Sequence, residues 1–339
     1  MSRRLLSTSC EGAGRGAFTL VELLVSMAIL TLLSAMLVGI LSAVNRQWSL
    51  AQAQIERCQD GRAILDKMGS ELKSAALPAN LSSTTGLQFI VNPPSAEGNS
   101  FGINSSYLNS SAIFWQAPIA HNTALGDIAE VGYFVKWGGT NSSNPQAELC
   151  RFFVDPAVVQ NSASVSNTNF LIYSQPGSWL TPNLIDAVAP ASSAGNYVGW
   201  MADNVVGLWV RCLDAYGQPI MKSAPGAIPT VNYAAYGFDS RMGYTDSRGN
   251  VKNGVSQLSS GPGFTQNLCA LPASVDIAIV VLDSKSALRI TTAITPGATS
   301  TVTLDSFWTD INTFMTALPA DVKQGARLYS TRVNLLNAR

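Results

Sequence analysis

The pattern of apolar and polar positions divides the chain into a long helix and a strand-rich remainder. From Phe18 to Val44 the only ionisable residue is Glu22. This run exceeds the roughly 20 apolar residues that a helix needs to cross a bilayer, and it predicts a transmembrane helix over residues 18–44. Because a carboxylate is unfavourable in hydrocarbon, we expect Glu22 to have a function and a partner.

The helical period continues past the predicted span. Residues 45–77 contain no proline, and Pro78 ends the segment. Apolar or small residues recur there in steps of three and four and form one stripe: Trp48, Ala51, Ile55, Cys58, Gly61, Leu65, Met68, Leu72 and Ala75. We expect one helix over Phe18–Ala76, roughly 90 Å long at about 1.5 Å per residue, whose second half packs on a globular head.

After Pro78 the period becomes that of β-strands. Short runs rich in β-branched and aromatic residues alternate with Gly, Pro, Ser and Asn. The predicted strands are Leu87–Val91, Ala112–Gln116, Glu130–Trp137, Glu148–Val154, Asn169–Tyr173, Val205–Leu213, Ser274–Leu282 and Ala326–Leu336. The turn after Trp137 predicts a hairpin. Val275–Leu282 presents apolar residues on both faces, which favours a central position in a sheet.

Two further features complete the predicted fold. Leu304–Ala317 reads as a short amphipathic helix with Asp305 as its cap and Pro319 as its stop. Long polar insertions, Ser192–Tyr197 and Pro219–Pro262, are typical of functional surface or disorder. The fold class is therefore α+β: a long transmembrane and amphipathic N-terminal helix packed on a β-rich, antiparallel head. The predicted divisions are a leader at 1–17, the span at 18–44, its amphipathic continuation at 45–77 and the head at 78–339.

Charge limits the functions that this chain can have. Lys plus Arg and Asp plus Glu are equal at 21 each, and charged residues make up only 12%. This balance argues against a basic nucleic-acid-binding surface. The leader contains Arg3, Arg4 and Arg15, whereas the next basic residue is Arg46. The asymmetry keeps residues 1–17 in the cytoplasm and directs the C-terminal body outward.

The start of the apolar run has a specific motif. A short basic leader and a small residue precede the string Phe18-Thr19-Leu20-Val21-Glu22. Here the chain resembles the type IV prepilin family, which includes the pseudopilins of type II secretion. The resemblance implies that prepilin peptidase cleaves the Ala17–Phe18 bond and methylates the new amine of Phe18. It also implies that Glu22, the fifth mature residue, pairs with the α-amine of an incoming subunit and fixes its register.

The position of Gly16 departs from the family pattern. The residue before the cleavage site is usually Gly, but here Ala17 lies between Gly16 and Phe18. Cleavage after Gly16 would make Glu22 the sixth mature residue, so we expect cleavage after Ala17. The alternative is a plain signal anchor whose Glu22 lies at the membrane interface.

Other segments extend the resemblance beyond the N-terminus. Cys58–Ala76 is similar to the helix of the large minor pilins of the PilW and J-type pseudopilin group. Ala202–Leu208, Leu271–Ile277 and Tyr329–Leu335 resemble strand segments of that group, most of all in the proteins called Verru_Chthon cassette protein C. The resemblance implies a single-pass inner-membrane minor subunit with a periplasmic head, which assembles with other pilin or pseudopilin subunits into a type IV pilus or type II pseudopilus.

Two other classes of function remain as alternatives. One is an anchored pilin-like adhesin or ligand-binding protein outside a filament. The other is a membrane-anchored hydrolase that uses scattered carboxylates. No sequence motif supports this alternative. His121 is the only histidine, and neither a phosphate-binding loop nor a dinucleotide motif occurs. We expect no enzyme activity and no cofactor.

Calcium is the one metal for which the sequence offers candidate ligands, in the polar segment 239–253. Asp239, Asp246, Asn250 and Asn253 lie close together in the sequence, but their spacing does not match the twelve-residue calcium loop. A solvated loop is the preferred interpretation, and calcium binding is its alternative.

Cysteines and tryptophans complete the candidate residues. Loss of the leader removes Cys10 and leaves four cysteines in an exported head. The favoured pairing is Cys150–Cys212 with Cys58–Cys269, and the alternative is four small buried hydrophobes. Scattered tryptophans in strand runs are more typical of a core than of a binding surface. They are Trp115, Trp137, Trp179, Trp200, Trp209 and Trp308.

Overall fold

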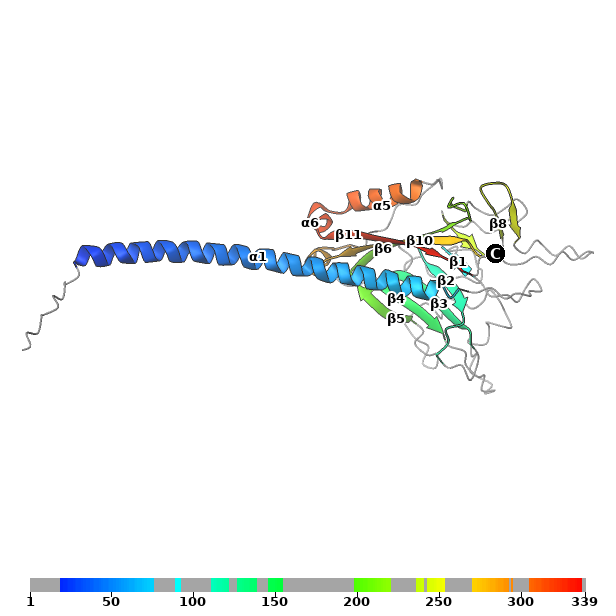
Figure 1. Ribbon diagram of the computed structural model, residues 1–339, viewed down its shortest axis with the longest axis horizontal. Helices are drawn as coiled ribbons and strands as arrows, with labels where there is room; N and C mark the ends of the chain where they lie inside the picture. The colour runs from blue at the N-terminus through cyan, green and yellow to red at the C-terminus, as the bar shows by residue number, and fades with distance from the viewer. Residues whose placement is uncertain are drawn as a thin grey trace, which may run out of the picture. The chain divides into compact units, whose positions relative to one another are not determined.

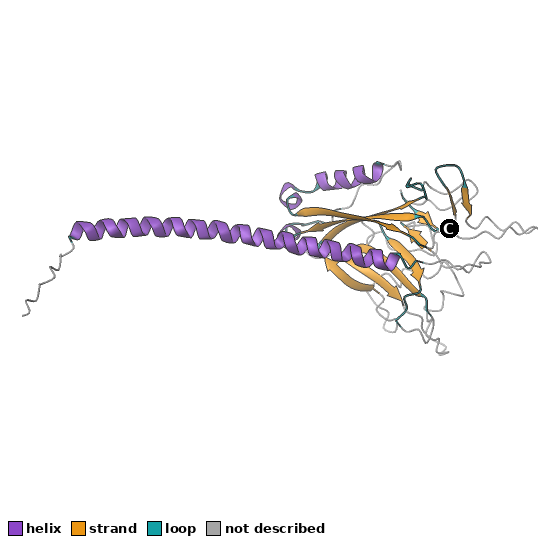
Figure 2. Cartoon of the chain, viewed as in Figure 1, coloured by secondary structure: helices purple, strands orange, loops and turns teal. Residues whose placement is uncertain are grey.

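The computed structural model describes one long helix and a β-rich head (Figures 1 and 2). The described residues are 19–75, 89–92, 111–121, 127–138, 146–154, 198–220, 236–240, 243–253, 270–292, 294 and 305–336. The helices are α1 (Leu20–Leu72), α4 (Ser284–Ala287), α5 (Ser306–Ala317) and α6 (Ala320–Lys323). The strands are β1 (Phe89–Val91), β2 (Ile113–Ala117), β3 (Ala129–Gly138), β4 (Gln146–Val154), β5 (Val198–Asp203), β6 (Val205–Leu213), β7 (Phe238–Asp239), β8 (Gly243–Thr245), β9 (Val251–Asn253), β10 (Ser274–Leu282) and β11 (Ala326–Asn334).

The chain divides into two compact units, one up to Ala53 and one from Gln54 onward. The first contains most of the apolar part of α1. Leu20–Ser49 has a mean hydropathy of 2.5, and its large apolar side chains are exposed. This part of the helix is long and apolar enough to cross a membrane.

The second unit contains antiparallel sheets. A six-stranded sheet has the order β5-β4-β3-β2-β1-β7, a three-stranded sheet has the order β11-β10-β6, and β8 and β9 form a hairpin. The expected central position of β10 is confirmed, since it pairs with β11 on one side and with β6 on the other. Both sheets, residues 64–72 of α1 and Ala75 contribute to one hydrophobic core.

Most predicted elements are present with small shifts at their ends. Predicted strands Val205–Leu213 and Ser274–Leu282 coincide with β6 and β10. Asp305 occupies the N-cap position of α5, but its side chain makes no capping hydrogen bond. The predicted strand Asn169–Tyr173 and the insertion Ser192–Tyr197 lie outside the described residues.

Three short strands occur where the sequence indicated only an insertion. β7, β8 and β9 lie within Pro219–Pro262 and are two or three residues long. Such short polar segments have no detectable period of two. The edge strand β5 was missed as well, because Val198-Gly199-Trp200-Met201 does not alternate.

Asn204 forms the corner at which the chain passes from one sheet to the other. Its φ is 61°, a left-handed conformation that Asn tolerates better than most residues. Its N–H donates to the Ala147 carbonyl of β4, and its carbonyl accepts from the Leu282 N–H of β10. Asn204, the one residue between β5 and β6, therefore joins both sheets.

The favoured Cys150–Cys212 disulfide is absent from the structure. Cys58, Cys150 and Cys212 are free thiols in the structure, and Cys269 lies outside the described residues. Cys150 pairs with Phe134 on the face of the six-stranded sheet away from the shared core, whereas Cys212 belongs to that core. Because their side chains lie in different layers, they cannot bridge. Burial raises the pKa of both thiols, that of Cys150 to about 11.

Tryptophans occur both in the core and on the surface. Trp115, Trp137 and Trp209 are buried as expected, whereas Trp200 is 63% exposed and Trp308 is 37% exposed. Trp179 lies outside the described residues. A surface role is therefore left open only for Trp200 and Trp308 among the described tryptophans of this set.

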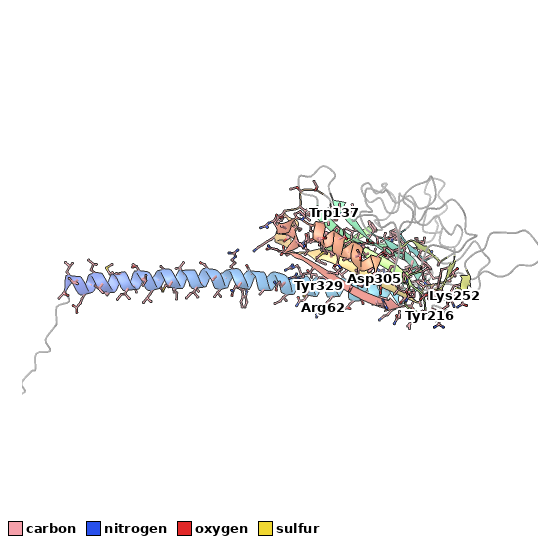
Figure 3. The ribbon with its side chains drawn as sticks, turned by 90° about the horizontal axis from the view of Figure 1, so that it is seen from above. Arg62, Trp137, Tyr216, Lys252, Asp305 and Tyr329 are labelled. Carbon is pink, nitrogen blue, oxygen red and sulfur yellow. The ribbon has the colours of Figure 1, made fainter. Side chains whose placement is uncertain are left out.

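Helix α1 lies directly against β11 in the head. A Cβ atom placed on Gly61 would be 2.6 Å from the Tyr329 ring, so glycine is needed for this approach. The Tyr329 hydroxyl donates to the Cys58 sulfur at 3.5 Å, and a Cβ on Gly69 would meet Val333 at 3.4 Å. Tyr329 is labelled in Figure 3.

We expect Gly61→Leu to lower the free energy of unfolding of the head by about 1–3 kcal/mol, the usual cost of overpacking. Chemical denaturation followed by tryptophan fluorescence measures it. Gly39→Leu is the matched control, because no atom lies within 4 Å of a Cβ built at that position. Equal loss in both variants would show that α1 does not pack tightly on β11.

Glu130 is a buried acid with incomplete hydrogen bonding. It lies on β3, is 1% exposed and faces Gln116 across the sheet. Its Oε1 has no hydrogen-bond partner among the described residues. Burial raises the pKa of Glu130 well above its ordinary value, and the Gln116 hydrogen bond offsets this only in part.

The head should therefore become less stable as the pH rises above the pKa of unfolded Glu, because the folded state then holds a proton that the unfolded state has lost. Glu130→Gln is expected to stabilise the head at pH 8 and to flatten this dependence. Denaturant midpoints between pH 5 and pH 8 measure both effects. Glu148→Gln, a partly exposed position on β4, is the control; identical pH profiles for wild type and Glu130→Gln would contradict the assignment.

Candidate functional site

The candidate site is the N-terminal end of α1. Gly16, Ala17 and Phe18, the predicted processing residues, lie outside the described residues, which begin with Thr19. Helix α1 begins at Leu20, and Glu22 lies in its first turn. Of the predicted processing and assembly residues, the structure thus describes Glu22 alone.

Thr19 and Glu22 form a capping box. The Thr19 N–H donates to Glu22 Oε2 at 3.1 Å, and the Thr19 hydroxyl donates to the same oxygen at 3.0 Å. In return, the Glu22 N–H donates to Thr19 Oγ1 at 3.3 Å. Free N–H groups at the start of a helix are satisfied in this way, and the carboxylate lies at the positive end of the helix dipole.

The sequence contained the signal for this arrangement. Thr19-x-x-Glu22 before an apolar run is the usual signature of a capping box. The sequence analysis did not predict this hydrogen bonding between Thr19 and Glu22. The structure therefore supplies a partner for Glu22 within its own chain. In a bilayer these hydrogen bonds would offset part of the cost of desolvating the carboxylate.

Behind this cap the helix has an apolar surface on all sides. Leu20 is 81% exposed, Leu30 is 66% exposed and Ile40 is 62% exposed. Ser26, Thr31 and Ser42 donate their hydroxyl protons to carbonyls of the preceding turn. With these three hydroxyl donors satisfied internally, this surface suits a lipid environment or the apolar surfaces of other helices.

At its other end α1 is attached to the head by a buried polar cluster around Glu71. Arg151 donates to both carboxylate oxygens, at 3.1 and 2.9 Å, and the Tyr133 hydroxyl donates at 2.6 Å. Lys67 pairs with Oε1 at 2.8 Å. Burial by itself would raise the pKa of Glu71, but the three donors outweigh it, so the net shift of the pKa is downward.

A second polar attachment lies earlier along the helix. Arg57 is 6% exposed, donates to the Gly325 carbonyl and lies 3.7 Å from the Asp283 carboxylate. Asp283 in turn caps α4 by accepting from the Ser286 N–H at 2.6 Å. The apolar stripe predicted from the sequence did not indicate Arg57 and Glu71, because both are charged residues outside it. The detectable signal was their place beside the apolar stripe.

Metal ligation finds little support in the described ranges. Within them no group of three or more His, Cys, Asp or Glu residues is arranged to hold a metal ion. Asp246 Oδ1 accepts from the backbone N–H groups of Arg248 and Asn250, and Oδ2 accepts from the Asn250 amide. These hydrogen bonds close the β8–β9 turn. The side chains of Asp239 and Asn253 are not described, and calcium binding there stays a prediction.

Comparison with known proteins identifies the N-terminal stretch. Residues 13–38 match the family model described as the prokaryotic N-terminal methylation motif. No curated protein and no solved structure matches the chain. The matched residues include the predicted cleavage site, the Thr19–Glu22 capping box and the first part of the apolar helix. The motif, the apolar helix and the antiparallel head together support a type IV prepilin-like protein.

Proposed function

We propose that this protein is a minor subunit of a type IV pilus or a type II secretion pseudopilus. Prepilin peptidase cleaves it before Phe18 and methylates the new amine, and other pilin or pseudopilin subunits are its partners. Before assembly it is held in the inner membrane by α1, with the head in the periplasm. Its role is structural, and we expect no catalytic activity.

The observation that carries this proposal is the match at residues 13–38, which extends into the first part of a long apolar helix. The motif supplies the processing site, and the helix supplies the surface that neighbouring subunits would bury. The size of the β-rich head favours a minor position, since a bulky head is hard to repeat around a tightly packed helical filament.

Glu22 has two successive partners in this mechanism. In the membrane-anchored subunit it accepts from Thr19, as the structure describes. In a filament it pairs with the methylated α-amine of a neighbouring subunit. An out-of-register subunit would leave both charges unpaired in an apolar surrounding, which costs several kcal/mol. The intramolecular cap therefore keeps the carboxylate partnered until the amine replaces it.

Processing is tested by mass spectrometry of the N-terminus in the membrane fraction, with and without the host's prepilin peptidase. We expect a chain that begins with N-methyl-Phe18 only when the peptidase is present. An intact leader, or a terminus far from Phe18, would show that the N-terminal segment is an ordinary signal anchor that prepilin peptidase does not process. The adhesin alternative would then be preferred.

Assembly is tested with Glu22→Ala. Co-purification with other prepilin-like subunits should fall at least about tenfold, because losing a buried charge pair costs more than about 1.4 kcal/mol. Glu148→Ala is the control, since it removes a partly exposed carboxylate from β4 of the head and leaves the helix surface unchanged. Unchanged co-purification of processed Glu22→Ala would remove Glu22 from the assembly mechanism.

A further inference from the structure

One corner of the head has exposed cations around an exposed leucine. It lies where β10 ends and β11 begins, at the paired residues Leu282 and Ala326, and it includes α4 and α6. Its exposed side chains are Lys285, Leu288, Arg289, Lys323 and Arg327, which we call the basic corner. Leu288 is 64% exposed, among the highest values for a large apolar side chain in the head.

The corner is held rigidly. The Asp283 N–H donates to the Gly325 carbonyl at 3.1 Å, which joins the start of α4 to the end of α6. A Cβ on Gly325 would be 2.0 Å from Ser286 Oγ, so the two segments are in close contact. Arg57 of α1 donates to the same Gly325 carbonyl. The cations and Leu288 are thus presented by a fixed backbone.

The basic corner has a net positive charge, although the whole chain has a formal net charge of zero. Four cations are exposed, whereas the Asp283 carboxylate is turned inward, with 16% of its side chain exposed. Asp321 is exposed by 55% and lies 3.9 Å from Arg289. Such an exposed pair is weak and separates easily. Counting Lys285, Arg289, Lys323 and Arg327 against Asp321 leaves a local charge of 4 − 1 = +3.

The arrangement of apolar and basic residues is typical of binding to a membrane surface. Lys285 and Arg289 lie within three residues of Leu288 in the chain, and all three side chains are exposed. Surface-binding segments insert such apolar side chains at the level of the acyl boundary, while Lys and Arg contact anionic headgroups. Each cation near an anionic leaflet favours binding by about fivefold.

Chain length keeps this corner near the bilayer. Arg57, which contacts the corner, is only eight residues beyond Ser49, the end of the apolar part of α1. Even a fully extended chain of that length spans at most about 28 Å. This maximum distance between Ser49 and Arg57 follows from chain length alone. The inference rests on one step of the proposed function, the anchoring of α1 in the membrane.

We propose that the basic corner binds the anionic lipid headgroups of the membrane in which α1 is anchored. Lys285, Arg289 and Lys323 contact lipid phosphates, and Leu288 enters the interface. The contact fixes the head on the leaflet surface while the subunit awaits assembly, and extraction into a filament must break it.

Hydrogen exchange of the full-length protein in lipid nanodiscs tests the proposal. Discs of pure phosphatidylcholine are compared with discs containing 30% phosphatidylglycerol. We expect the amides of 284–292 and 319–327 to exchange at least about fivefold more slowly in the anionic discs, given about fivefold per engaged cation. High salt should abolish the difference, because it screens exposed charges.

The triple variant Lys285→Gln, Arg289→Gln, Lys323→Gln should lose this protection, and Leu288→Ser should weaken it. The matched control is Arg248→Gln with Lys252→Gln on the β8–β9 hairpin. That hairpin binds through Ser247 to Asp214, next to Leu213 at the opposite end of β10. The control should keep the full lipid effect, and circular dichroism checks that each variant is folded.

Equal exchange in both kinds of disc, or equal loss in the triple and control variants, would overturn the proposal. Protection that appears only when an acidic protein partner is added would assign the corner to that partner and would also overturn it. The outcome is independent of processing, because an uncleaved chain is anchored by the same helix. Failure of N-terminal methylation and failure of lipid binding are therefore distinguishable.

Discussion

The packing of residues 57–72 of α1 into the head is the constraint on which the remaining structure depends. Met68 and Leu72 are at most 1% exposed and belong to the same core as both sheets. One continuous helix must therefore present an apolar surface to lipid at its start and a specific, close-packed face near its end. Gly61 shows how strict the second requirement is, since Tyr329 of β11 lies too close to the helix there for any side chain.

Buried charges specify how the elements of the head are joined. Glu71 connects α1 to β3 and β4 through Tyr133 and Arg151. On β10, Asp276 pairs with Arg211 of β6 at 2.9 Å and with Arg332 of β11 at 2.7 Å. Helix α5 covers this ladder, with the Phe307 ring 4.5 Å from the Arg211 guanidinium. Removing one partner would strand a buried charge, so these groups tie each element to a defined neighbour.

The same principle applies at the opposite end of α1. Glu22 is not a bare charge in an apolar helix, because Thr19 donates two hydrogen bonds to it. A carboxylate held in this way has a partner within its own chain, and in the proposed filament a stronger, charged donor would replace the neutral one. The proposed function thus depends on an exchange of hydrogen-bond partners at the N-terminal end of the helix.

The sequence by itself determined the helix, the motif and the longest strands. Their signals are local: an apolar run, a string of five residues, and short runs rich in β-branched and apolar residues in β6 and β10. It also indicated Glu22 and the central position of β10. Only the tertiary structure decided which cysteines can meet, that Arg57 and Glu71 are buried, and that Asn204 joins two sheets. Each of these depends on contacts between residues far apart in the chain, and local periodicity contains no record of which distant surface a side chain will face.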